Sequence, residues 1–152
     1  MEQKTKIHAE DGKQELFITR EFDLPLESLF EAYVDSEIVE HWMGTKVIKL
    51  DSRKHGSYQF ETSHGGSVVF SANGVIHECV LNEKITRTFE MENTPFPIQL
   101  EYLNFEKLNE NTSKLTMHVI YKSVAIRDQL LQMPFGAGIS MAHDRLQNYF
   151  KK

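Results

Sequence analysis

Seven histidines and one cysteine are the residues able to hold a metal ion or attack an electrophile. The histidines stand at positions 8, 41, 55, 64, 77, 118 and 143. None of them belongs to a His-Glu-x-x-His motif or stands beside a Cys-x-x-Cys pair, the spacings that gather ligands around zinc. His77 and Cys79 are two positions apart in an expected strand, with neither a helix N-terminus nor an orienting base nearby to activate the thiol. We therefore expect no metal site and no catalytic residue from this set, and we expect Cys79 to be a small buried hydrophobe.

Carboxylates are the second group that could do chemistry, because a carboxylate facing an apolar cavity has a raised pKa and can act as a general base. Four of them fall on the outer faces of short expected helices, where solvated charge is ordinary: Glu27, Glu31, Glu37 and Glu40. Three others fall in expected strands: Glu78, Glu101 and Glu106. If one of these three faces a cavity, a cyclase- or hydrolase-like enzyme using a cavity Glu or His becomes an alternative. The sequence contains no clear polar cluster that decides for it.

The third chemistry is the binding of an apolar molecule, since 10 Phe, 5 Tyr and 1 Trp are a surplus of large flat side chains. Residues two apart in a strand share a face. This spacing predicts a ligand-binding face made of Tyr58, Phe60, Phe70, Ile76, Phe89, Leu103, Phe105 and Met117. Three further residues are expected to close its mouth: Trp42, Phe135 and Met141. The alternative is that these residues fill an ordinary core, because sheet interiors look the same with or without a void.

A pocket of this kind normally adds a few convergent polar groups to its apolar walls. Tyr102, His77, His118 and Arg87 are the candidates in the expected strands. None of them forms a recognisable constellation.

Helices and strands must position these residues, and their order follows from the hydrophobic period. Residues 15–22 predict a first strand after a polar lead, residues 1–13, expected to be frayed. A short helix is expected to begin at Pro25, a residue tolerated at the first helical position. A second helix is expected to be capped by Asp35 or Ser36 and stopped by Gly44.

From residue 46 to residue 121 the pattern has period two, with turn residues between the runs, which is typical of an antiparallel meander. The six expected strands are residues 46–51, 57–62, 67–78, 84–91, 98–107 and 113–121. After Ser123 the helical period returns, interrupted by Pro134, Gly136 and Gly138, and then runs as one apolar stripe to Tyr149. We predict an α+β fold: a curved antiparallel sheet of about seven strands around a long C-terminal helix, with two short helices after the first strand.

Several segments, taken in order, resemble the START-like (SRPBCC, helix-grip) superfamily. They are Arg-Glu-Phe-Asp-Leu-Pro at 20–25, His-Trp-Met-Gly at 41–44, Gly-Ser-Tyr-Gln-Phe at 56–60, Gly-Val-Ile-His-Glu at 74–78, Lys-Ile-Thr-Arg-Thr-Phe at 84–89 and Asp-Arg-Leu at 144–146. The resemblance is greatest to the branch named after the C-terminal domain of the heat-shock protein 90 ATPase activator, and it spans roughly residues 14–150. It implies a sheet that grips the last helix, with an apolar cavity between them able to admit a lipid, a polyketide or another flat molecule.

The sequence departs from the branch at Trp42-Met43, where paired aromatics are common, and at the single glycine of residues 53–56. The namesake also has a separate N-terminal chaperone-binding domain, for which this chain has no room, so stimulation of the chaperone's ATPase is not carried over.

Composition excludes several other classes. The chain has 152 residues, 26% charged residues and a net charge of -5, which argues against a nucleic-acid binder. No stretch approaches the roughly 18 to 20 apolar residues of a membrane span, and one cysteine demands no oxidising compartment, so we expect a cytoplasmic protein.

We expect one START-like domain over residues 1–152 that binds a hydrophobic small molecule, with no cofactor and no catalytic step. A chaperone-associated interaction module is a further alternative, and the sequence does not decide between monomer and homodimer.

Overall fold

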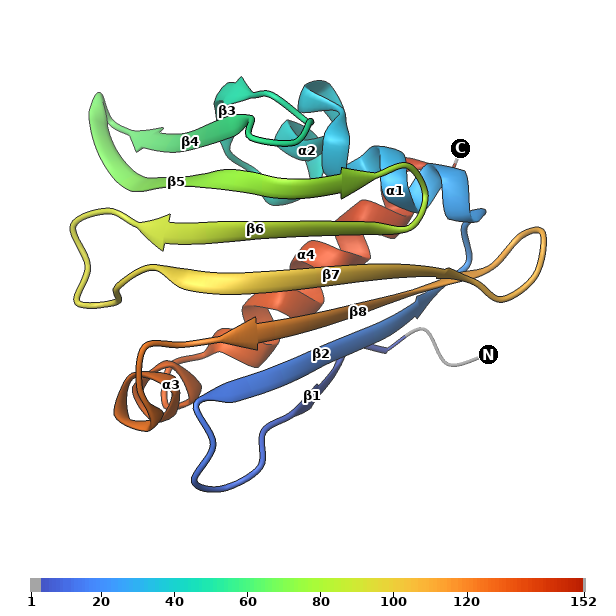
Figure 1. Cartoon of the computed structure of the whole chain (residues 1–152). Coiled ribbons are helices and arrows are strands. Elements are labelled where there is room, and N and C mark those ends of the chain that lie inside the picture. The colour runs from blue at the N-terminus through green and yellow to red at the C-terminus, as the bar shows by residue number, and fades with distance from the viewer. Residues whose placement is uncertain (1–3, 152) are drawn as a thin grey trace.

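The structure is a computed structural model that describes residues 4–151. Within these residues eight strands form one antiparallel sheet, in the order β1-β2-β8-β7-β6-β5-β4-β3 (Figure 1). The strands are β1 Lys6–His8, β2 Glu15–Phe22, β3 Lys46–Leu50, β4 Ser57–His64, β5 Ser67–Val80, β6 Lys84–Met91, β7 Gln99–Lys107 and β8 Ser113–Ile120. Apart from the return from β8 to β2, the neighbours are successive in the chain, as the meander pattern predicted.

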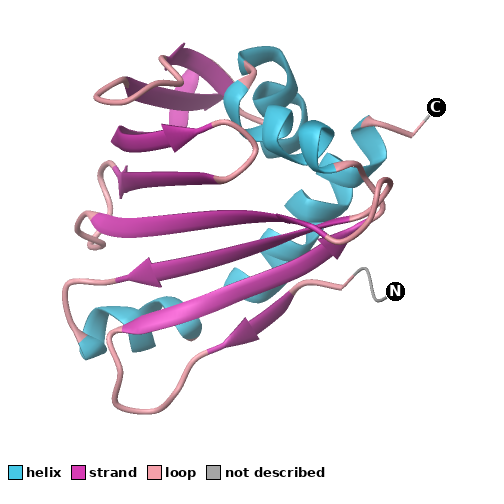
Figure 2. Ribbon diagram, turned by 45° about the vertical axis from the view of Figure 1, so that its right-hand side comes forward, coloured by secondary structure: helices cyan, strands magenta, loops and turns pink. Residues whose placement is uncertain are grey.

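Four helices complete the described chain: α1 Leu26–Val34, α2 Ser36–Met43, α3 Val124–Leu131 and α4 Phe135–Tyr149. The long helix α4 crosses one face of the sheet behind β6, β7 and β8, and α1 and α2 lie beside its C-terminal end (Figures 1 and 2). The predicted α+β helix-grip architecture is confirmed. Throughout residues 4–151, no helix combines the length and the apolar character that crossing a membrane would need.

The core lies between the sheet and these helices. Its fully buried side chains come from alternate positions of the strands and from the inner stripe of α4, among them Leu16, Leu103, Leu115 and Leu146. This is the arrangement expected when a period-two face meets a period-3.6 face.

The N-terminal lead differs from the expectation of a frayed segment. Residues 6–8 form β1, which pairs antiparallel with β2 from Lys6 opposite Thr19 to His8 opposite Phe17. Ile7 is half-buried, and its Cδ1 lies 3.3 Å from where a Cβ on Gly136 would be. The pairing covers the edge of β2 that β8 leaves open, and Ile7 gains apolar contact near α4. Residues 1–3 of the lead lie outside the described residues.

The helix ends show how local the signals for these elements are. Asp35 caps α2 by accepting a hydrogen bond from the Ile38 N–H at 3.1 Å, and Gly44 ends it with φ of 66°. Both agree with the sequence prediction. The start of α4 does not, because the helix begins at Phe135, directly after Pro134, and therefore includes both of the glycines expected to interrupt it. Proline is well tolerated just before a first helical turn.

The pairing register shifts once each between β3 and β4, between β4 and β5, and between β5 and β6. Such bulges increase the local twist and bend a strand. In the same part of the sheet, Tyr58 of β4 stands opposite Gly74 of β5, and the Tyr58 hydroxyl donates a hydrogen bond to the carbonyl of Thr88 on β6. The ring can lie across β5 only because position 74 has no side chain: an added Cβ would lie 2.1 Å from the Thr88 carbonyl oxygen and 2.5 Å from the Tyr58 ring.

Gly74→Ala is therefore expected to destabilise the protein by about 3 kcal/mol, at the upper end of the usual cost of overpacking. Urea denaturation measures this change. Gly138→Ala is the matched control, because a Cβ there meets open space on α4, and alanine should stabilise the helix by about 0.5 to 1 kcal/mol. Equal effects of the two substitutions would contradict the packing described at Gly74.

Candidate functional site

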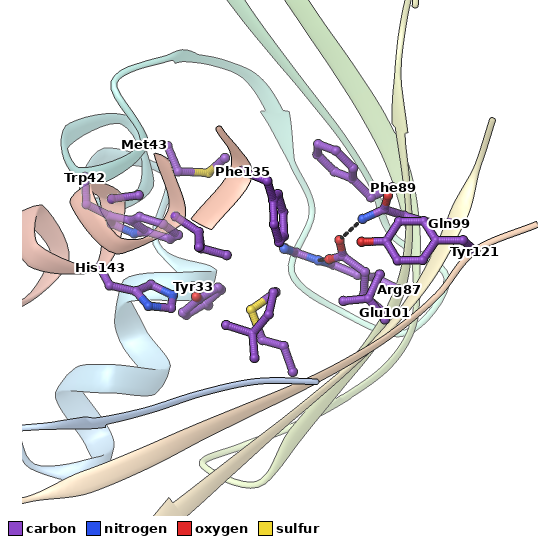
Figure 3. Close-up of a pocket in the computed structure, with 15 residues that line it drawn as sticks. Tyr33, Trp42, Met43, Arg87, Phe89, Gln99, Glu101, Tyr121, Phe135 and His143 are labelled. Carbon is purple, nitrogen blue, oxygen red and sulfur yellow. Dashed lines mark hydrogen bonds and ion pairs between the residues drawn. The ribbon is translucent and has the colours of Figure 1, made fainter. Parts of the chain in front are cut away.

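A cavity of about 210 Å³, partly open to solvent, lies between α4 and the sheet. Its wall is formed by helices α1, α2 and α4 and by strands β2, β6, β7 and β8 (Figure 3). The residues that line it are Ile18, Tyr33, Trp42, Met43, Arg87, Phe89, Gln99, Glu101, Met117, Val119, Tyr121, Phe135, Ile139, Ala142 and His143. Most are apolar, so the cavity is suited to an apolar molecule.

The structure brings together only part of the predicted binding face. Trp42, Phe89, Met117 and Phe135 line the cavity. The others are in different places: Tyr58, Phe60, Ile76, Leu103 and Phe105 are buried in the filled core, Phe70 packs half-buried at its edge, and Met141 is 60% exposed on α4. The Tyr58 and Phe60 rings pack against each other in that core with their centres 5.1 Å apart, whereas Met141 is on the solvent-exposed face of α4. Strand alternation selects the inward face, but only the path of α4 decides which inward residues border a void.

Sequence reasoning missed most of the cavity wall. Two sequence patterns, the alternation within strands and the apolar stripe of α4, agree with the observed wall. Gln99 and Glu101 share a face with Leu103, and Val119 and Tyr121 share one with Met117. On α4, the residues at 135, 139, 142 and 146 form one helical stripe; three of them line the cavity, and Leu146 is in the core.

The polar part of the cavity is a buried cluster of Arg87, Glu101 and Gln99. Arg87 and Glu101 stand directly opposite each other on β6 and β7, and their side chains are 11% and 5% exposed. The Arg87 Nε–H donates to Glu101 Oε1 at 2.8 Å, and the Gln99 amide donates to Glu101 Oε2 at 2.7 Å. The guanidinium also lies 5.4 Å from the ring centre of Tyr58 and 5.9 Å from that of Tyr33.

The hydrogen bonds of this cluster bear on whether a carboxylate in the cavity could act as a general base. Glu101 does face the cavity, but both of its oxygens accept hydrogen bonds, and a buried arginine compensates its charge. A general base must reach the proton that it removes, and the ion pair and the Gln99 amide hold this carboxylate in place. The geometry therefore favours a structural role for Glu101 over acid–base catalysis.

Tyr121 follows β8 and projects into the cavity beside this cluster. Figure 3 shows its hydroxyl oxygen directed inward, toward Glu101 and Arg87. The residue is 3% exposed, and nowhere in residues 4–151 does a group form a hydrogen bond with this hydroxyl. Its backbone is held by Gln14, whose side chain donates to the Tyr121 carbonyl at 2.9 Å and whose carbonyl accepts from the Tyr121 N–H at 2.8 Å. Burial raises the pKa of Tyr121, so the hydroxyl is neutral.

His143 contributes to the wall from α4. It is 1% exposed, its Nδ1 lies 2.8 Å from Thr5 Oγ1, and its ring meets the ring of Phe22 edge-on at 5.5 Å. Burial, with a smaller effect from the nearby charge of Arg20, lowers the pKa of His143 to about 4. The imidazole is therefore neutral at pH 7.

This shift predicts a loss of stability in mild acid. Between pH 6.5 and about 4 the unfolded chain binds a proton at His143 that the folded protein does not. The contribution of His143 to stability is thus complete above pH 6.5 and falls by about 3 kcal/mol as the pH approaches 4. Denaturation measured across this range, on wild type and on His143→Leu, isolates the effect as a difference. A difference that does not vary with pH would contradict the prediction.

The other polar candidates lie away from the cavity. Tyr102 and His118 are on the opposite face of the sheet, where His118 stacks on Phe17 at 4.3 Å and its Nε2 lies 2.7 Å from Glu15 Oε1. Cys79 is half-buried rather than fully buried, and burial raises the pKa of its thiol. Across the part of the chain that the structure describes, no three metal-ligating side chains gather at one point.

A second cavity of about 260 Å³ adjoins the first below the start of α4. Phe89, Gln99 and Phe135 border both cavities, and Met91, Leu130, Met133 and Pro134 complete the wall of the second. These three shared residues thus lie where the two largely apolar spaces meet.

The sequence profile of the family described as "Activator of Hsp90 ATPase homolog 1-like protein" matches residues 23–151. A search of curated proteins found no match.

Solved structures share the fold over almost the whole chain. Protein Ms6760 from Mycobacterium smegmatis is 21% identical with a TM-score of 0.82, covering 97% of this chain and 95% of its own. A Rhodobacter sphaeroides protein is 16% identical with a TM-score of 0.84, covering 96% and 97%. A protein from Arthrobacter aurescens is 14% identical with a TM-score of 0.80, covering 93% and 88%.

Proposed function

Because this chain belongs to the family of Activator of Hsp90 ATPase homolog 1-like proteins, we propose that it binds a hydrophobic small molecule in the cavity between α4 and the sheet. The observation that carries the proposal is the cavity itself, about 210 Å³ in volume and walled mainly by apolar side chains. The cavity is partly open to solvent, so its empty state leaves apolar wall in contact with water. A bound apolar molecule would cover that wall.

The size of the cavity limits the ligand. An engineered apolar cavity of about 150 Å³ in another protein binds a benzene ring, so 210 Å³ suits a molecule of one or two rings or a short lipid chain. Rotation of the Phe135 side chain would join this space to the adjoining one of about 260 Å³. A longer lipid or polyketide would then fit.

Binding without turnover is favoured over a cyclase or hydrolase activity. The two titratable side chains best placed for catalysis are Glu101, engaged through both oxygens, and His143, whose lowered pKa makes it a weak base. Neither side chain is therefore well arranged to act as a general base.

The test is native mass spectrometry of the purified protein, followed by thermal-shift measurements with fatty acids, sterols, flavonoids and polyketides. A selective ligand at a hundredfold excess over its Kd stabilises the folded state by about 2.7 kcal/mol, which is a measurable change in Tm. A co-purifying mass or a selective shift would support the proposal. If no mass and no shift were found across the panel, the proposal would be wrong, and a chaperone-interaction module would be the next hypothesis.

A further inference from the structure

We infer that the ligand of this cavity carries an uncharged oxygen acceptor, such as a ketone or enone carbonyl, which accepts a hydrogen bond from the hydroxyl of Tyr121. The inference rests on the proposed function and extends it to the chemical class of the ligand. Its basis is the position of Tyr121: a 3% exposed residue whose hydroxyl points into the cavity (Figure 3) and, among residues 4–151, meets no hydrogen-bond partner.

An unpaired buried hydroxyl costs free energy, because it has lost its hydrogen bonds to water without replacing them. Nearly all buried polar groups in folded proteins are paired, so an exception calls for an explanation. Here the residue that carries the unpaired hydroxyl lines the cavity, and the hydroxyl is directed inward (Figure 3). A ligand oxygen placed against it would supply the missing partner.

The remaining polar groups of the cluster determine the charge of that ligand. The Arg87 guanidinium is already paired with Glu101 at 2.8 Å, so the cluster is neutral as a whole. A carboxylate ligand would bring a second negative charge close to Glu101 and leave one buried charge uncompensated. A neutral carbonyl oxygen avoids this penalty and still accepts from the neutral hydroxyl of Tyr121.

The rest of the wall determines the body of the ligand. Trp42 and Met43 lie across the cavity from the cluster (Figure 3), with the apolar side chains of α4 beside them. A molecule that satisfies both sides has a flat or compact apolar body with one oxygen at its end. A hydrophobic ketone has this chemistry, whereas a fatty-acid anion does not.

The inference is tested with three naphthalenes of similar size: 2-acetylnaphthalene, 2-isopropenylnaphthalene and 2-naphthoate. Isothermal titration calorimetry gives the Kd of each for wild type and for Tyr121→Phe. We expect wild type to bind the ketone about tenfold more tightly than the hydrocarbon, and to bind the carboxylate more weakly than either. In Tyr121→Phe the ketone should lose this advantage, with affinities within about twofold of each other, while the affinity for the hydrocarbon stays the same.

Tyr102→Phe is the matched control, since it makes the same substitution on the opposite face of the sheet. It should keep the preference for the ketone. Equal binding of ketone and hydrocarbon by wild type, or a ketone preference that survives in Tyr121→Phe, would overturn the inference and leave the proposed function standing. Failure of all three probes to bind wild type would count against both.

Discussion

Ala142→Trp is expected to lower the affinity of the protein for any ligand of the cavity at least a hundredfold while leaving the fold intact. Ala142 is a wall residue of α4, and the space in front of it is part of the cavity of about 210 Å³. An indole ring at this position would occupy the space that the ligand needs. Because the ring fills a void instead of displacing packed side chains, the usual penalty of overpacking should be small.

Met141→Trp provides the control for Ala142→Trp. Met141 is the preceding residue on the same helix, but its side chain is 60% exposed and does not border the cavity. Titration with a compound identified by the thermal-shift screen should give wild-type affinity for Met141→Trp and no measurable binding for Ala142→Trp.

A second filling variant keeps the prediction testable if Ala142→Trp folds poorly. Met117→Trp fills the same space from β8, on the sheet side of the cavity. Unchanged affinity in both folded variants would show that the ligand binds elsewhere.

Arg87→Leu is expected to reduce the free energy of unfolding by about 3 to 5 kcal/mol, because it leaves the buried carboxylate of Glu101 without its compensating charge. The double variant Arg87→Leu/Glu101→Leu removes both charges and should recover most of that loss. Urea denaturation of wild type, both single variants and the double variant gives the coupling energy of the pair.

An exposed ion pair on the same strand serves as the comparison. Lys84 of β6 pairs with Glu78 at 3.3 Å, with side chains 38% and 47% exposed. Lys84→Leu should scarcely change stability, because such pairs contribute little in water. A double variant no more stable than Arg87→Leu alone would contradict the view that the unpaired charge causes the loss.

Much of the fold could be predicted because its signals are local. The Asp35 cap, the stop at Gly44 and the alternation of residues 113–121 each depend on neighbours within a few positions. The order of the elements followed from the hydrophobic period, and the family resemblance added the expectation of a cavity between the sheet and the last helix. Strand β1 was missed because three residues carry too short a pattern, and their pairing depends on β2, which lies farther along the chain.

The candidate site was predicted less well, and Leu103 and Met117 show why. They stand opposite each other on β7 and β8 and face the same side of the sheet, yet Met117 lines the cavity and Leu103 is fully buried in the core. The sequence assigns both to the inner face by strand alternation. It contains nothing local that separates them.

The sequence by itself therefore determined the helix-grip fold, the inward face of each strand and the apolar character of the interior. The tertiary structure alone decided where a void remains and which polar groups meet in it. Two long-range contacts hold α4 against α2: Arg145 Nε donates to the Trp42 carbonyl at 2.8 Å, and the Tyr149 ring lies 5.0 Å from His41. The resulting path of α4 sets the space above the sheet, and the β6–β7 register brings Arg87 to Glu101. Packing and register of this kind join residues far apart in the chain, so no local pattern encodes them.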